Sequence, residues 1–485
     1  MIASALLPPT WGWSLLFLFS GLWIGLGMLW GGRAASLDGY MLANRNVGIA
    51  LGAATAVATW ITSNTTMLAP QFALQMGMWG MIAYSTAAIG LLLFAPMAER
   101  IRKLMPHGYT SAEFVRLRYG NKAWTAFLVI SIFYSLTWMV SMGMAGGMLL
   151  EALSDIPYVY GMSVILFVCV TYTLFGGLFA VIGTDFIQSL VILIGVVVVA
   201  VAVLSQVSLT EVYEITKTER PELLNILFPA AIMAFFNNLL FGLGEVFHSN
   251  VWWARAFAMR PGVGKRAYVL AAVIWLPIPI AAGFLALAAP ALGINILRPD
   301  MVGPVVAGTV AGQIGSVIVF VLVFSSIASS IDSLLAATSQ LITIDIYKQL
   351  VRPQASSEQM RKVAARIIVV MGLFTWLVCL PKIGNLATVL FFAGPLVGST
   401  TWPILAGLYW RQTNRMGATF ALVSGSILGL WAYFQIGWYT GALVGTGVSF
   451  LITAISTWLA PNDYQWSLLN PDVQEGRNTS AHQPS

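Results

Sequence analysis

The chain has 485 residues, of which 58% are hydrophobic and only 9% are charged. A soluble globule carries about a quarter charged residues, so this composition excludes a water-soluble enzyme, a disordered chain and a secreted disulfide scaffold. The formal net charge of +6 does not indicate nucleic acid, because nearly all the cations are confined to alternate loops of one long apolar chain.

Apolar stretches long enough to cross a bilayer, about 20 residues each, follow one another along the chain. We expect thirteen membrane helices, near residues 11–31, 47–74, 77–99, 122–151, 157–176, 178–206, 226–258 (interrupted), 265–291, 312–337, 363–384, 385–410, 416–436 and 440–459. The first stretch lacks the basic start and cleavage site of a signal peptide. We therefore predict an all-α polytopic protein with one transmembrane domain over residues 1–460 and a short disordered cytoplasmic tail over 461–485.

The basic residues predict the orientation of the chain. Twenty Lys and Arg side chains, Arg255 among them, fall in loops on one side of the membrane, and the other side receives only Lys217, Arg220, Arg298 and Lys382. Cytoplasmic loops are enriched in Lys and Arg, so we expect the N-terminus outside and the C-terminus in the cytoplasm of a plasma membrane (the inner membrane in a bacterium). Cys169 and Cys379 lie within apolar spans, so neither a disulfide framework nor a cysteine metal site is expected.

Two spans contain polar interruptions. The second span includes the run Thr59–Thr66, and the seventh includes Phe241–Asn250 with two glycines, Glu245 and His248. Backbone that leaves helical geometry in a membrane must be buried in protein or line a cavity, and paired interruptions in two halves point to a transporter site. We expect structural repeats over about 47–206 and 226–410, each opening with its interrupted helix. The alternative is that both runs are helix-packing seams.

Polar groups inside the spans narrow the chemistry. Asp185 and Asp332 are ionisable groups at membrane depth, which are costly and usually functional. Ser326, Ser329 and Ser330 share one helical face with Ser333, and hydroxyl and carbonyl oxygens are ligands for hard cations. This stripe, opposite the free carbonyls of a broken helix, predicts a Na⁺ site. The alternative is that the serines bond only to carbonyls of their own helix.

The chain resembles the sodium:solute symporter family. The motifs that carry the resemblance occur in the family's order and cover about 400 residues: Asp38–Arg45, Pro106–Gly120, Tyr172–Gln188, Thr343–Tyr347 and Gly407–Ala418. The resemblance implies a LeuT-type core of five-plus-five inverted repeats, with one extra N-terminal and two extra C-terminal helices. Trp60 and the segments Met76–Gly80 and Val246–Ala256 lean toward the urea and polyamine subgroup.

The resemblance also implies two ion sites. The common sodium site falls on the carbonyls of Ala58, Ile61 and Ser326 and the hydroxyls of Ser329 and Ser330. Some members hold a second sodium ion, and Asp185 and Ser333 keep that pattern, whereas Asp332 stands where those members have serine. Asp332 therefore either strengthens a second cation site or holds a proton.

The substrate is expected to be a small neutral or cationic nitrogen compound such as urea, because we see no Lys or Arg at membrane depth to bind an anion. Amino acids, pantothenate, monocarboxylates and sugars are the alternatives. Core packing is an equal alternative for each aromatic in the candidate cavity. The candidates are Trp60, Thr62, Asn64, Thr65, Gln75, Tyr134, Trp138, Glu245, His248 and Asn250, with Trp402 as a further one.

The function predicted from these features is sodium-coupled import of a small polar solute by alternating access. Its partners are the solute, Na⁺ as the coupling ion and the lipid bilayer, with no other cofactor, no transition metal and no nucleic acid. An enzyme is not expected, because no catalytic constellation surrounds His107, His248 or His482. A transporter-like membrane sensor and a passive channel are alternatives of a different class, and the sequence indicates no oligomeric state.

Overall fold

The computed structural model describes residues 6–34, 36–225, 227–296, 298–384 and 386–470, and these residues are almost entirely helical. No strand occurs in this part of the chain, and the only sheet-like contact is an isolated bridge between Val47 and Met259. The predicted all-α class is confirmed.

The first half of the chain contains nine α-helices. Their bounds are α1 Pro9–Gly31, α2 Leu37–Leu42, α3 Ile49–Trp60, α4 Ala69–Ser85, α5 Ala87–Leu104, α6 Ser111–Tyr119, α7 Asn121–Ser154, α8 Tyr158–Leu204 and α9 Leu209–Glu219. Between α3 and α4 the segment Asn64–Leu68 forms a wider π-helical turn.

The second half continues the same pattern of long and broken helices. Their bounds are α10 Pro229–His248, α11 Asn250–Ala258, α12 Gly264–Trp275, α13 Pro277–Ala288, α14 Val302–Val310, α15 Gly312–Leu341, α16 Ser357–Cys379, α17 Leu386–Phe391, α18 Gly394–Tyr409, α19 Arg415–Gln435 and α20 Gly441–Leu459. A π-helical segment, Ile342–Val351, extends α15.

Eleven helical segments among the described residues are long and apolar enough to cross a membrane. Several of them are longer than one crossing requires, and two of these, Asn64–Leu104 with 41 residues and Tyr158–Leu204 with 47, contain non-helical backbone in their interior. Each runs through a glycine with positive φ, Gly77 (61°) or Gly177 (52°). A reversal at both glycines would give the predicted thirteen spans, and that number stays a prediction.

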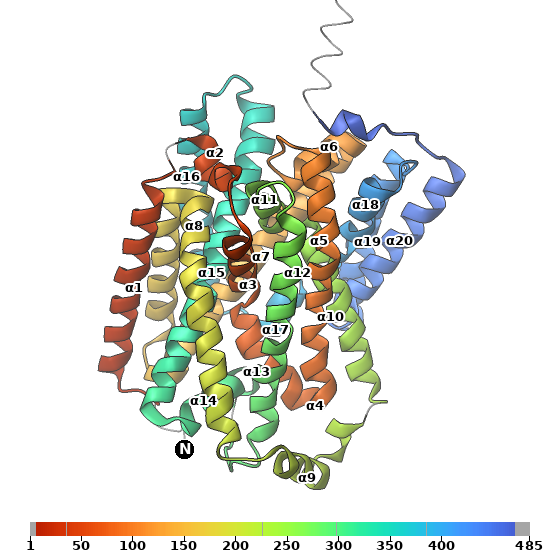
Figure 1. The fold of residues 1–485 in the computed structure, drawn as a ribbon. Helices are drawn as coiled ribbons and strands as arrows, with labels where there is room; N and C mark the ends of the chain where they lie inside the picture. The colour runs from red at the N-terminus through yellow and green to blue at the C-terminus, as the bar shows by residue number, and fades with distance from the viewer. Residues whose placement is uncertain (1–5, 35, 226, 297, 385, 471–485) are drawn as a thin grey trace, which may run out of the picture.

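The helices are arranged with the most buried ones at the centre. In Figure 1, α1 flanks one side of the bundle and α19 and α20 flank the other, with α3 between them. The apolar windows of α7 and α15 are 72% and 78% buried, whereas those of α1 and α20 are 28% and 33% buried. Eight of the twelve residues of α3 are buried, including all from Thr55 to Trp60, so the interrupted end of this helix lies among protein.

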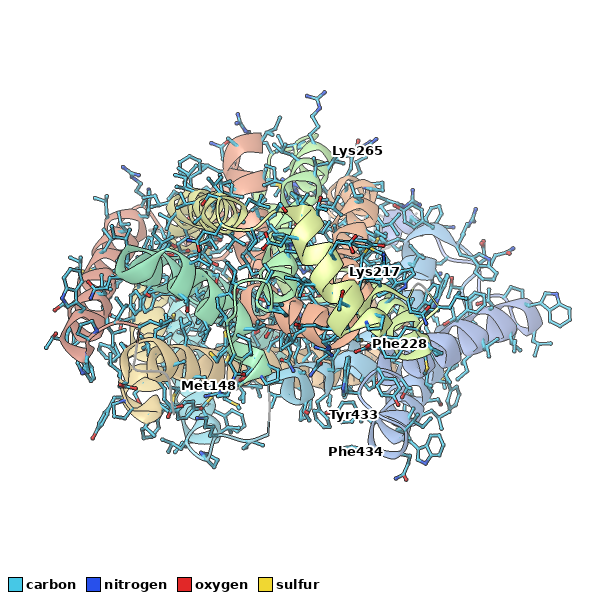
Figure 2. All side chains as sticks on the ribbon, turned by 90° about the horizontal axis from the view of Figure 1, so that it is seen from below. Met148, Lys217, Phe228, Lys265, Tyr433 and Phe434 are labelled. Carbon is cyan, nitrogen blue, oxygen red and sulfur yellow. The ribbon has the colours of Figure 1, made fainter. Side chains whose placement is uncertain are left out.

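The two ends of the bundle differ. One end carries α2 and α6 and is called here the α6 end; the opposite end carries α9 and is called the α9 end (Figure 1). Viewed from below, α9 with Lys217 lies across the α9 end (Figure 2).

The predicted disordered tail is wrong for its first ten residues. Tyr464 and Leu469 are buried, and residues Trp466–Leu469 form a short 3-10 helix. The Arg118 guanidinium lies 4.4 Å from the ring centre of Tyr464, and that of Arg100 lies 4.3 Å from the ring of Trp466. Cation–aromatic contacts thus hold this segment on the α6 end, and residues 471–485 lie outside the described residues.

Replacing Gly177 tests the turn inside α8. A Cβ at this position would lie 2.4 Å from the carbonyl oxygen of Tyr40, and the backbone conformation disfavours any side chain. We expect Gly177→Ala to destabilise the protein by about 1–3 kcal/mol, measured as a lower thermal unfolding midpoint in detergent. Gly21→Ala on α1, where a Cβ meets nothing within 4 Å, is the matched control, and equal midpoints for the two variants would contradict this account.

Candidate functional site

The interruption of the second predicted span lies at Ile61–Ser63. Helix α3 ends at Trp60, and Ile61 leaves helical geometry with φ −83° and ψ 88°. The Thr62 hydroxyl accepts hydrogen bonds from the N–H groups of Asn64 (3.0 Å) and Thr65 (3.3 Å). The Thr65 hydroxyl donates to the Trp60 carbonyl at 3.1 Å. Threonine side chains thus satisfy backbone groups that the break leaves without helical partners.

The serine stripe of α15 faces the end of α3. The Ser329 hydroxyl lies 2.8 Å from the Ala58 carbonyl oxygen, and the Ser330 hydroxyl lies 3.3 Å from that of Thr59. Both hydroxyls also lie within 3.1 Å of the Ser326 carbonyl on their own helix. The two serine hydroxyls therefore contact the carbonyls of α3 and also bond to a carbonyl of their own helix α15. The structure brings the oxygens of Ala58, Ser326, Ser329 and Ser330 into one buried group, with Ile61 as the first residue beyond the helix.

The two buried carboxylates have different partners. Asp185 on α8 forms an ion pair with Arg255 at 3.0 Å, and the Thr55 hydroxyl donates to it at 2.5 Å. Asp332 on α15 receives hydrogen bonds from the Tyr172 hydroxyl at 2.7 Å and the Ser333 hydroxyl at 3.2 Å. No cation is paired with Asp332 among the described residues.

Arg255 corrects the sequence interpretation. The sequence placed it in a basic loop, whereas its side chain is fully buried on α11, in contact with groups from the membrane helices α3, α8 and α15. The statement that no Lys or Arg lies at membrane depth is therefore wrong. A signal was present, since Arg255 stands within the otherwise apolar run Val251–Ala258.

The seventh predicted span is interrupted at a single residue. Helix α10 ends at His248, Ser249 is extended with φ −66° and ψ 128°, and α11 begins at Asn250. Gly242 and Gly244 lie inside α10, where a Cβ would come within 2.8 Å of Ala87 and 2.4 Å of the Val397 carbonyl oxygen. The helix-packing alternative thus holds for the two glycines, while the break itself falls at Ser249.

A cavity of about 310 Å³ lies beside the first break. It is lined by Trp60, Thr62, Tyr84, Ala87, Trp138, Asn238, Phe241, Trp275 and Leu390. The rings of Trp60 and Trp138 are nearly parallel (7°), as are those of Trp138 and Phe241 (10°). The indole N–H groups of Trp60 and Trp138 are buried without a hydrogen-bond partner. Flat aromatic rings thus form much of the lining, and two of the lining tryptophans have indole N–H groups without a partner.

Three aromatic side chains pack together next to the cavity. Phe72, Phe391 and Trp438 stack on one another, with ring centres 4.7–5.8 Å apart. Phe391 also packs on the cavity residue Phe241 at 5.3 Å.

A hydrogen-bonded group adjoins the cavity residue Trp60. Glu245 accepts from the Tyr134 hydroxyl at 2.5 Å and from the Trp252 indole at 3.0 Å, and Trp252 meets Trp60 edge to face at 5.1 Å. Packed side chains thus adjoin the cavity at Phe241 and at Trp60.

The other predicted cavity residues lie elsewhere. Asn64 and Thr65 belong to the break itself. Tyr134, His248 and Asn250 line a separate space of about 200 Å³ between α7, α10, α11 and α15. Gln75 is exposed on α4.

Trp402 packs on Phe450 between α18 and α20, away from the cavity. The sequence interpretation missed the liners Tyr84, Asn238, Phe241 and Trp275. The amide pair Asn237-Asn238 in an apolar span was the available signal for one of them.

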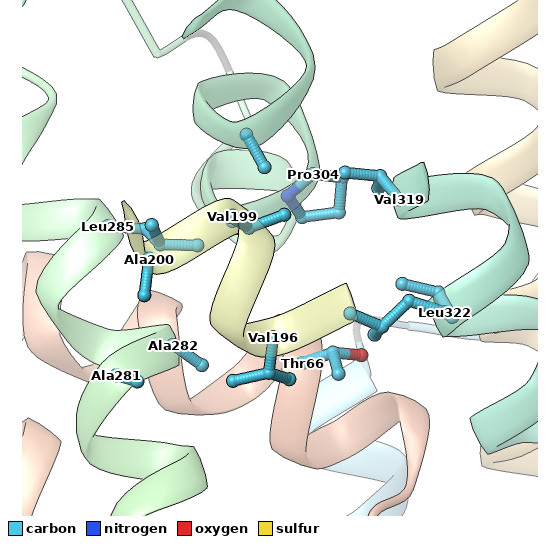
Figure 3. Close-up of a pocket in the computed structure, with 13 residues that line it drawn as sticks. Thr66, Val196, Val199, Ala200, Ala281, Ala282, Leu285, Pro304, Val319 and Leu322 are labelled. Carbon is cyan, nitrogen blue, oxygen red and sulfur yellow. The ribbon is translucent and has the colours of Figure 1, made fainter. Parts of the chain in front are cut away.

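A larger space of about 440 Å³ lies between α8, α13, α14 and α15 (Figure 3). Thr66 is the only residue with a polar side chain among those that line it, and the others are aliphatic or glycine. Such walls suit hydrocarbon rather than a polar solute, so this space is not the solute site.

Three of the sequence motifs meet at the α6 end. The Tyr109 hydroxyl and the Arg45 guanidinium both bind Asp38. The Thr110 hydroxyl donates to Asp345 at 2.6 Å. Burial, with the neighbouring Asp38 carboxylate, raises the pKa of Tyr109 to about 12, so its hydroxyl remains a donor.

Asn250 ties the second break to this end. Its side-chain oxygen accepts from the Ser111 N–H at 3.0 Å, and its amide nitrogen donates to the Ala337 carbonyl at 2.8 Å. Within the described residues, no three His, Cys, Asp or Glu side chains come together as metal ligands.

The sequence and the fold of this chain are similar to those of known proteins. The sequence model described as "Sodium:solute symporter family" matches residues 40–425. A solved structure of a Na⁺-coupled sialic acid symporter, in a substrate-bound outward-open state, has a TM-score of 0.79 at 18% identity. It covers 93% of this chain and 99% of that one. At this identity the likeness concerns the fold.

Curated relatives include transporters of different solutes. The chain is 26% identical to the urea-proton symporter DUR3 of Oryza sativa subsp. japonica, with 93% of this chain and 70% of the relative aligned. It is 26% identical to the probable urea active transporter 1 of Schizosaccharomyces pombe, over 68% of this chain but only 54% of the relative's length. It is 25% identical to the osmoregulated proline transporter OpuE of Bacillus subtilis, over 87% of each chain.

Proposed function

The chain belongs to the sodium:solute symporter family, and on that premise we propose that it imports a small, neutral, planar solute such as urea together with Na⁺. The family and the fold make it a multi-pass membrane transporter rather than an enzyme. The observation that carries the solute class is the neutral cavity beside the α3 break, with its free indole N–H groups. We propose that it acts in the plasma membrane with the α6 end facing the cytoplasm.

The coupling Na⁺ is proposed to bind where the serine stripe meets α3. The ligands would be the carbonyl oxygens of Ala58, Ile61 and Ser326 and the hydroxyl oxygens of Ser329 and Ser330. All five residues are buried, and four of them lie within hydrogen-bond distance of one another across the α3–α15 contact. Oxygen ligands without a net charge suit a hard monovalent cation.

The chemistry of the cavity supports a neutral solute. None of its nine lining residues is charged, so a charged solute would lose its hydration without gaining a counter-ion. The two free indole donors of Trp60 and Trp138 fit a carbonyl oxygen. The water-accessible room in the cavity is only about 20 Å³, which is about the size of one water molecule, and this favours a small solute such as urea over a sugar. The urea-transporting relatives support the same solute.

A carboxylate solute is less compatible with the break. The N-terminus of a helix attracts anions through its free N–H groups. Here the Thr62 hydroxyl already accepts from the N–H groups of Asn64 and Thr65. Arg255 is paired with Asp185, and it is not among the cavity liners. Amino acids and monocarboxylates therefore rank below urea-like solutes.

Transport follows from the position of the ion site between two elements. Na⁺ held by α3 and α15 would stabilise the conformation in which these helices lie close together. Binding shifts the population of conformations only because Na⁺ has a higher affinity for this conformation than for the other. The packed side chains that adjoin the cavity at Phe241 and at Trp60 would separate in turn to open it. Inward movement of Na⁺ down its gradient and potential, about 2.3 kcal/mol per charge per 100 mV, would drive accumulation.

Removing both ion-binding hydroxyls tests the sodium site. We expect Ser329→Ala with Ser330→Ala to abolish sodium-stimulated urea uptake in proteoliposomes, because two of the proposed ligands are lost while the helix is kept. The matched control is Ser325→Ala on the same helix, whose buried hydroxyl has no partner and is outside the proposed site. Sodium stimulation that persists in the double variant, or is lost equally in the control, would contradict the site.

Removing one of the two unpaired indole N–H donors tests the proposed solute class. Trp138→Phe keeps a flat ring but removes one N–H donor, and the loss of one hydrogen bond is expected to raise the half-saturating urea concentration about tenfold. Trp402→Phe, at the edge of the bundle, should leave it unchanged. Competition by urea, proline and a sugar against labelled urea uptake completes the test, and stronger competition by proline than by urea would overturn the assignment.

A proton is the alternative coupling ion, and Asp332 is the group that favours it. Its carboxyl group is fully buried and is bonded by hydroxyls rather than by a cation. If Asp332 carries a coupled proton, a pH gradient alone should drive urea uptake, and Asp332→Asn should abolish that uptake while a sodium gradient still drives transport. Uptake in both proteins that follows only the sodium gradient would exclude this alternative.

A further inference from the structure

Arg255 brings a fixed positive charge to the point where α3, α8 and α15 meet. Its Nη2 atom lies 3.0 Å from Asp185, 2.6 Å from the Ser333 hydroxyl and 2.6 Å from the Thr59 hydroxyl. Its Nε donates to the Thr55 hydroxyl at 3.0 Å, and Nη1 donates to the Val251 carbonyl at 3.1 Å. The guanidinium is fully buried and each of its nitrogens has a partner.

These partners include the residues expected for a second sodium ion. Asp185 and Ser333 are the two positions at which this sequence keeps the family pattern for that ion, and both are bound to Arg255. A guanidinium only donates hydrogen bonds and cannot lose its charge in a protein. The oxygens around it therefore accept from Arg255, and a metal cation in the same place would be repelled. The residues present do not fit a second Na⁺.

The charge of Asp185 also requires a partner. A buried carboxylate without a counter-ion is strongly destabilising, and one of the Asp185 oxygens already lacks any hydrogen bond. Arg255 is the only cation in contact with Asp185 among the described residues. The Arg255 guanidinium permanently balances the negative charge of Asp185, so no dissolved cation is needed to balance it.

The arginine network is continuous with the proposed sodium site. Thr59 accepts from Arg255 through its hydroxyl and from Ser330 through its carbonyl. Ser333, which also binds Arg255, donates to the Ser329 carbonyl at 2.7 Å. The guanidinium thus lies next to the proposed ligands, where a second bound cation would have to be.

We propose that Arg255 is a tethered cation that replaces a second coupling ion, so that the protein carries one sodium ion per solute. This inference rests on the proposed sodium coupling and adds its stoichiometry. It predicts that the second site becomes available to Na⁺ when the guanidinium is removed and Asp185 is kept.

The first experiment uses the wild-type protein. Fluxes of labelled sodium and labelled urea into proteoliposomes at a clamped potential should give one sodium ion per urea, with first-order dependence on sodium concentration. A ratio of two sodium ions would overturn the inference while leaving sodium coupling intact. A wild-type protein without any sodium response would contradict the proposed function, and the variants below would then decide the inference by themselves.

The second experiment compares three variants in detergent without solute. Arg255→Ala should gain a thermal stabilisation by Na⁺ over K⁺, at equal ionic strength, that the wild type lacks. Arg255→Lys keeps a tethered charge and should gain none, and Arg255→Ala with Asp185→Asn removes both charges and should gain none. Equal sodium responses in Arg255→Ala and the double variant would overturn the inference.

A third measurement covers the case in which Arg255→Ala folds poorly. The free guanidinium ion at low millimolar concentration should restore the folded yield of Arg255→Ala, because it replaces the lost group at the same site. The double variant should not respond, since the carboxylate that binds the ion is absent. Failure of guanidinium and of Na⁺ to stabilise Arg255→Ala would count against the inference.

Discussion

Backbone N–H and C=O groups inside an apolar helical bundle need hydrogen-bond partners, and this requirement determines where the helices of this protein can be interrupted by polar residues. Helix α3 stops at Trp60, and the groups released there are taken up by Thr62, Thr65 and hydroxyls of α15. A break without such partners would be too costly in hydrocarbon. The same residues that make the break tolerable therefore supply a group of uncharged oxygens, and the cavity proposed for the solute lies beside this break.

The buried carboxylates of this interior are bonded more often by hydroxyl and indole groups than by cations. Asp185 is paired with an arginine, whereas Asp332 and Glu245 accept hydrogen bonds from hydroxyl and indole donors. The cavity itself has no charged wall. In the proposed assignment, the ion binds at the α3–α15 contact and the solute binds among aromatic faces, with Trp60 next to both.

Sequence patterns predicted the features that differ most from an apolar background. The serine stripe and the polar run after Thr59 were identifiable because hydroxyl and amide groups are rare in membrane spans. Arg255 was misplaced because a basic residue near the end of a predicted span looks the same whether it belongs to a loop or to a short buried helix. Gly244 was ambiguous because glycine both breaks helices and lets them approach. Cavity aromatics such as Trp275 could not be distinguished from core or lipid-facing ones by periodicity alone.

The last described segment of the chain has a mechanical consequence. Tyr464 and Trp466 are bound to Arg118 on α6 and Arg100 on α5, and the Trp466 indole donates to the Gly407 carbonyl on α18. These contacts lie on α5, α6 and α18, whereas the proposed ion ligands lie on α15 and at the end of α3. Of the three contacted helices, α5 also contributes Ala87 to the cavity lining. A fluorescent reporter fused after residue 470 would therefore be attached to α5, α6 and α18. It would report a displacement of these three helices relative to α3 and α15.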